Sequence, residues 1–113
     1  LAHCAVGLEY PVGDRQKSQV FIGKLLAPFV RGAALGEKPF GKNAPTGPEF
    51  KIVDEREFAA EHRKLSGLVT RFCDLGASGA DGKVHSFFGR LSGEQWGRLM
   101  YKHLDHHLRQ FNC

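Results

Sequence analysis

The chain has 113 residues, of which 42% are hydrophobic and 25% are charged. This composition excludes a disordered tail, and the length allows one domain with its own core but not two. No apolar run approaches the ~20 residues that cross a bilayer, so we expect no membrane partner. The net charge of +4 is spread without a block of like charges, which favours a solvated surface over a nucleic-acid-binding face.

The three cysteines, Cys4, Cys73 and Cys113, form an odd set without a C-x-x-C spacing. This argues against a disulfide scaffold and favours a reducing, cytoplasmic location. The chain begins at Leu1 and not at Met, and no charged-then-apolar leader precedes it. We therefore expect either a processed chain or one whose true beginning is missing.

A helical stripe opens the chain, and a second helix follows it. The i, i+3, i+4, i+7 spacing of His3, Val6, Gly7 and Tyr10 predicts a helix over residues 1 to about 11, ended by Pro11 and Gly13. The second predicted helix runs from about Lys17 to Leu35, and Gly36 should end it in the left-handed conformation. Its expected apolar face consists of Val20, Phe21, Leu25, Phe29 and Val30.

Residues 36–53 are rich in proline and glycine and lack a helical period. Two interpretations remain open for this long connection: an extended crossover packed over a helix bundle, or a loop that forms a pocket.

Asp54 should open a third helix, because negative charge favours a helix N-terminus. Gly76, Gly79 and Gly82 mark the turn after it, and residues 85–91 should form a loop pinned by two aromatics. Ser92 and Gln95 form a capping-box pattern that predicts a last helix reaching about Phe111. The expected buried face of the third helix is Phe58, Leu65, Leu68, Val69 and Phe72.

No segment alternates with period two, so the chain is predicted to be all-α. Three complete helices and one truncated helix suggest an antiparallel bundle.

Two histidines fall on the apolar stripe of the last helix. At ~100° per residue, His103 and His107 lie between Met100 and Phe111, whereas His106 lies to one side. Imidazoles four residues apart on one helix face can bind a single metal ion. The alternative is a pair of core histidines hydrogen-bonded to serine, glutamate or backbone groups, and at this point both remain open.

A third metal ligand would have to come from another helix. His3 is the strongest candidate because it shares a stripe with Val6 and Tyr10, and His62 is the reserve. His85 precedes the last helix and is expected to be structural, orienting Phe87 and Phe88. No H-E-x-x-H motif supports a zincin-type protease.

The segment His85-Ser-Phe-Phe-Gly-Arg-Leu-Ser-Gly-Glu-Gln-Trp-Gly97, followed by Tyr-Lys-His-Leu-Asp-His-His-Leu-Arg-Gln-Phe111, resembles an uncharacterised bacterial branch of the DinB-like (YfiT-like) metalloenzyme superfamily. Leu-Ala-His-Cys-Ala5 and Asn43-Ala-Pro-Thr-Gly-Pro48 match the same branch. One departure is that Leu108-Arg109-Gln110 stands where relatives commonly have Arg-Gly-Gln.

The resemblance implies one domain over residues 1–113, a DinB-like antiparallel four-helix bundle. It also implies a divalent metal, most readily zinc or nickel, held by His3, His103 and His107. The first helix of the superfamily has no counterpart here, so we expect an N-terminally incomplete domain. Such a bundle would expose a broad apolar groove, which a missing segment or a partner would fill.

Characterised members of the superfamily resemble S-transferases and isomerases that use low-molecular-weight thiols. The first functional hypothesis is therefore a metal-dependent thiol S-transferase or hydrolase acting on a small molecule, with Lys38 and Lys42 steering an anionic substrate. Glu9 and Glu61 are the candidate general bases, and Cys4 is expected to be a packing residue. The alternative is a non-catalytic module that acts through dimerisation, with a structural metal or a buried histidine network. Superfamily members are often dimeric, so a homodimer is expected.

Overall fold

The fold is mostly helical, and the computed structural model describes all residues 1–113. Four helices, α1 (Ala2–Val12), α2 (Phe21–Leu35), α3 (Phe58–Ala80) and α4 (Gly93–Gln110), are joined by a short 3₁₀ turn, η1 (Pro48–Phe50), and a hairpin. The hairpin strands are β1 (Val84–His85) and β2 (Gly89–Arg90), which pair antiparallel. None of the helices combines the length and the apolar character needed to cross a membrane.

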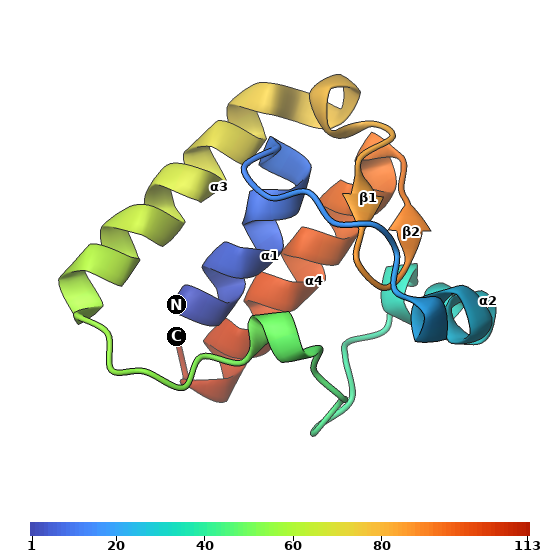
Figure 1. Cartoon of the computed structure of the whole chain (residues 1–113). Helices are drawn as coiled ribbons and strands as arrows, with labels where there is room; N and C mark the ends of the chain where they lie inside the picture. Colours follow the sequence, from blue (N-terminus) through green and yellow to red (C-terminus); the bar gives the residue numbers. More distant parts are fainter.

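The helix α1 lies at the centre of the molecule. Figure 1 shows it between α3 and α4, and every residue from Cys4 to Pro11 is buried. A helix that is apolar on all sides is stable only when neighbours cover it on all sides. Its one buried charge, Glu9, forms ion pairs with Arg15 and Lys64. Gly13 ends the helix at φ 89°, in the left-handed region that glycine enters without a steric penalty.

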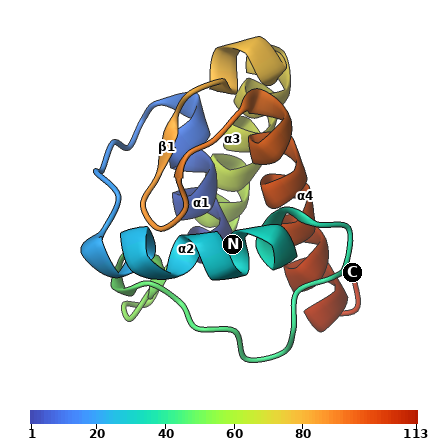
Figure 2. The same cartoon turned by 90° about the vertical axis from the view of Figure 1, so that its right-hand side faces the viewer.

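The arrangement is not a simple four-helix bundle. In Figure 1, α1 and α3 run in the same general direction and α4 runs in the opposite direction, so the start of α1 lies beside the end of α4. Figure 2 shows α2 lying across the other helices and not alongside them. The expectation of four bundled helices was therefore wrong for α2. The all-α prediction holds apart from the two short strands of the hairpin.

The predicted start of α2 at Lys17 was four residues too early. Before α2 the chain is held in an extended form by the hairpin, since Val20 N–H donates to the Ser86 carbonyl and the Gln19 amide donates to the Phe87 carbonyl. Gly36 does end the helix, but with an extended backbone at φ −73° and not in the left-handed form.

The predicted start of α3 at Asp54 was also early. Asp54 is paired with Arg56, and Glu57 caps the helix by accepting hydrogen bonds from the backbone of Ala59 and Ala60. The break expected at Gly76 is present, because this residue is not helical (φ 66°, ψ 178°), but a further helical stretch follows it up to Ala80. The predicted buried face of α3 was correct at Leu68, which is buried, but wrong at Phe58, which is exposed.

The capping box that opens α4 is confirmed. The Ser92 hydroxyl accepts from Gln95 N–H, and the Gln95 side chain accepts from Ser92 N–H. Trp96 follows with its ring fully buried, and its indole N–H donates to the Lys83 carbonyl. These contacts fix the register of α4 against the hairpin and thereby place its last two turns beside the start of α1.

Candidate metal centre

Three histidines meet where the first turn of α1 passes the last two turns of α4. His3, His103 and His107 are each half-buried, and one ligand atom from each lies within 4.8 Å of the others. Their rings are in mutual edge-to-face contact, with centroids 4.8 to 4.9 Å apart. Because α1 and α4 run in opposite directions, they bring together His3 and His103, which are 100 positions apart in the sequence.

Two of the rings are oriented by hydrogen bonds on the side away from the cluster. The Nδ1–H of His3 donates to the Phe50 carbonyl in η1 at 2.9 Å, and the Nδ1–H of His107 donates to the Gln110 side-chain oxygen at 2.8 Å. A ligating imidazole typically makes such a bond with its second nitrogen, which fixes the tautomer and leaves Nε2 free to bind a metal. Gln110 thus contacts a predicted ligand, whereas Arg109 pairs with Asp105.

His103 is the innermost of the three histidines. Burial, reinforced by the neighbouring histidines, lowers its pKa to about 3, and burial also lowers the pKa of His107. Both rings are therefore neutral at pH 7, which is the form that binds a metal. The His103 ring packs against the backbone of α1 at Gly7, where an added Cβ would lie 3.2 Å from Nδ1 and 3.3 Å from Cε1.

The three nitrogens would have to move to hold one metal ion, because the closest pair would open and atoms up to 4.8 Å apart would close. Zn–N bonds of ~2.0–2.1 Å in tetrahedral geometry separate two ligand nitrogens by about 3.3 Å. The Nε2 atoms of His3 and His103 lie 2.8 Å apart, so they would open by about 0.5 Å. As they stand, the His103 Nε2–H donates to the His3 Nε2 lone pair. The same three residues therefore suit either a metal ion or a hydrogen-bonded histidine network. In such a network the hydrogen-bond partners of the rings are a backbone carbonyl, a glutamine and another histidine, and not the serine or glutamate that was also considered.

The other histidines lie outside the cluster. His62, the reserve candidate, is exposed on α3 and stacks on Phe58. His85 has the structural role predicted for it, because its Nδ1 accepts hydrogen bonds from the backbone N–H groups of Phe87 and Phe88. His106 packs its ring against Phe40.

No carboxylate or thiol belongs to the three-histidine group. Burial opposes ionisation of Glu9, yet its hydrogen bonds and ion pairs with Lys64 and Arg15 hold its pKa below the usual value, so it is a structural anion. Glu61 pairs with Arg56 through one oxygen, and its other oxygen is buried without a partner. Burial raises the pKa of the Cys4 thiol, as suits a packing residue. Lys38 and Lys42 are exposed.

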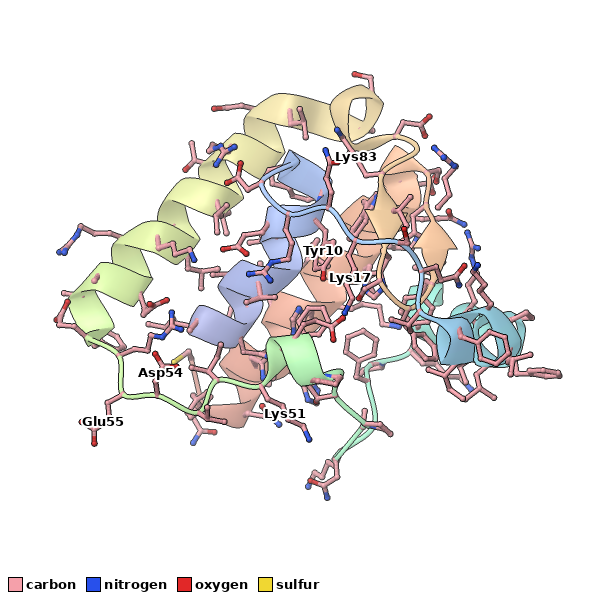
Figure 3. The ribbon with its side chains drawn as sticks, in the orientation of Figure 1. Tyr10, Lys17, Lys51, Asp54, Glu55 and Lys83 are labelled. Atoms are coloured by element: carbon pink, nitrogen blue, oxygen red, sulfur yellow. The ribbon has the colours of Figure 1, made fainter.

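A surface cavity of about 390 Å³ has none of the three histidines in its lining. It lies beside the segment that follows α1, and Tyr10, Lys17 and Lys83 from its lining are labelled in Figure 3. The Tyr10 ring contacts the Phe50 ring, which also contacts His3. Phe50 therefore connects Tyr10, in the wall of this cavity, with His3.

Three contributors to the centre were not recognised in the sequence: Gly7, the Phe50 carbonyl and the orienting role of Gln110. The spacing placed Gly7 on the same stripe of α1 as His3, four residues on, but the contact of the His103 ring with Gly7 was not predicted. The Phe50 carbonyl had no sequence signal, because any residue in η1 has a carbonyl and only the path of the long connection brings this one to His3.

Comparison with known proteins places the chain in a family without adding a function. No curated protein and no solved structure matches it. One family matches over residues 1–113, the whole length, and on that basis the chain belongs to the family described as "Protein of unknown function (DUF1569)".

Proposed function

We propose that this protein binds a divalent metal ion through His3, His103 and His107. The observation that carries the proposal is the convergence of three imidazoles from two antiparallel helices, with ligand atoms within 4.8 Å. The hydrogen bonds to Phe50 and Gln110 support it, because they orient two of the rings from outside. An all-imidazole donor set suits zinc or nickel. The same features favour placing the family in the DinB-like superfamily.

The proposed reaction class is transfer or hydrolysis that begins from a thiol or a water molecule. Three protein ligands leave at least one position open, as in catalytic sites and unlike closed structural ones. A divalent ion there would act as a Lewis acid and lower the pKa of a thiol or of water. His103 and His107 contribute by staying neutral at pH 7. A small-molecule thiol is the proposed cosubstrate, and the three free cysteines suit the reducing cytoplasm in which such thiols are abundant.

A non-catalytic module is the second candidate. Two observations favour it: the candidate bases Glu9 and Glu61 are held in ion pairs, and α2 presents a large apolar face to solvent. In that case the metal, or the histidine network, would join the start of α1 to the end of α4 and serve stability alone.

The first experiment measures bound metal in the untagged protein after incubation with zinc or nickel and removal of excess ion. We expect about one ion per chain, lost in His103→Ala and retained in His62→Ala, the matched control on α3. Absence of metal from the parent protein, or equal loss in both variants, would contradict the proposal.

A second assay separates the two candidates. The metal-loaded protein is given bacillithiol or mycothiol and an aryl halide, and formation of the thioether with release of halide and a proton is followed. Turnover that is lost in His103→Ala supports the transferase. A protein that binds metal but shows neither this turnover nor ester hydrolysis supports the structural role.

A further inference from the structure

The helix α2 carries its large apolar side chains on the outside. Six of them are between 42% and 83% exposed, whereas its buried residues are Gly23, Ala27 and Leu35. In Figure 2 no other segment of the chain lies over the outer side of α2. The six residues, here named the α2 face, are Phe21, Ile22, Leu25, Leu26, Phe29 and Val30.

The orientation of α2 is fixed by its inner side. A Cβ at Gly23 would overlap the Phe87 carbonyl oxygen, so only glycine allows this approach to the hairpin. At the other end, the Lys102 ammonium donates to the carbonyls of Ala33 and Ala34. Arg31 donates to the Arg90 carbonyl and the Gln95 side chain. The helix therefore cannot turn its large side chains inward without breaking these contacts.

The α2 face is large enough to be an interface. Side chains of this size carry roughly 150–200 Å² each, so at the observed exposures the six present roughly 600 Å² per chain. Two such faces together would bury roughly 1,200 Å², the lower end of the range for specific protein interfaces. The roughly 600 Å² of a single α2 face is at the upper end of the range for the largest apolar patch on a typical monomer.

We propose that the α2 face binds the α2 face of a second copy of this chain, forming a twofold dimer. The face has no acidic residue, and Arg31 is turned back onto the protein, so Lys24 is the one charge of α2 without a partner. A helix that lies on a membrane surface needs several basic residues on its polar side, whereas the other side of α2 is in contact with its own protein. A twofold interface uses the same patch on both subunits, and the α2 face has almost no like charge to oppose such a contact.

Sedimentation velocity over a range of concentrations tests this proposal and does not depend on metal binding. We expect the parent protein to be a dimer and the double variant Leu25→Asp/Phe29→Asp to be a monomer with unchanged helical content and Trp96 fluorescence. Both residues are already exposed, so the change should not disturb folding. Val53→Asp is the matched control, since Val53 is 95% exposed outside α2, and it should remain dimeric.

Two results would overturn the proposal. One is a parent protein that stays monomeric at every concentration, and in that case binding to vesicles of anionic phospholipid would assign the α2 face to a membrane surface. The other is a double variant that remains dimeric, which would place the contact on a different surface.

Discussion

Gly7→Ala should weaken metal binding while leaving the fold intact. The new Cβ would lie 3.2 Å from Nδ1 of His103, tighter than an ordinary contact by a few tenths of an ångström. The backbone of α1 is packed on all sides, so the His103 ring is the part that moves. Displacing a ligand by this amount resembles the loss of an outer-shell partner, which lowers metal affinity by roughly 10- to 100-fold. We expect a loss near 10-fold, equivalent to about 1.4 kcal/mol.

The free energy of unfolding of the metal-free protein should change in a different way. Alanine is more favourable than glycine inside a helix by about 1 kcal/mol, which offsets the strain at His103 and leaves a net change within about 1 kcal/mol of zero. Affinity would be measured by competition with a chromophoric zinc chelator, and stability by urea denaturation followed through Trp96 fluorescence. Gly67→Ala on α3 is the control, because nothing lies within 4 Å of its added Cβ. Unchanged zinc affinity in Gly7→Ala would refute the geometry described for His103.

Two further predictions concern stability. Burial lowers the pKa of His85 to about 4, so between pH 6.5 and 4 the unfolded chain binds a proton that the folded chain does not, and stability falls with acid. Lowering the pKa from 6.5 to about 4 corresponds to about 3 kcal/mol, so His85→Asn should make this part of the metal-free protein's pH–stability curve less steep. The slope contributed by His103 and His107 should remain, and His62→Asn should leave the whole slope unchanged. Lys102→Met keeps the buried stem but leaves the Ala33 and Ala34 carbonyls without their donor, so urea denaturation should show a loss of about 2 kcal/mol. An equal loss in Lys24→Met, on the exposed side of α2, would contradict that assignment.

The sequence predicted well wherever local periodicity and capping determine structure. The stripe of α4 and its capping box followed from residue spacing, and so did the end of α1 at Gly13. Because the same stripe carries His103 and His107, and the stripe of α1 carries His3, the members of the histidine cluster could be named in advance. Their approach to one another follows from the antiparallel packing of α1 and α4, which was expected from the bundle.

The sequence misled wherever a residue's role depends on what it packs against. The apolar residues of α2 have the spacing of a core-facing helix, and periodicity cannot show that Gly23 and Ala27 form the inner side. The start of α2 was placed early because hydrogen bonds to the hairpin determine where this helix begins. The start of α3 was placed early because the Glu57 side chain caps that helix. Capping propensity alone would have allowed the earlier starts.

X-ray absorption spectroscopy at the zinc edge tests the central claim most directly, because it reports the ligands of the bound ion. For the zinc-loaded protein we predict three imidazole nitrogens at ~2.0–2.1 Å, with outer-shell scattering from the rings, and oxygen or sulfur in the remaining position. His3→Ala should reduce the imidazole count to two. A shell of oxygen atoms with no imidazole scattering would contradict the three-histidine centre.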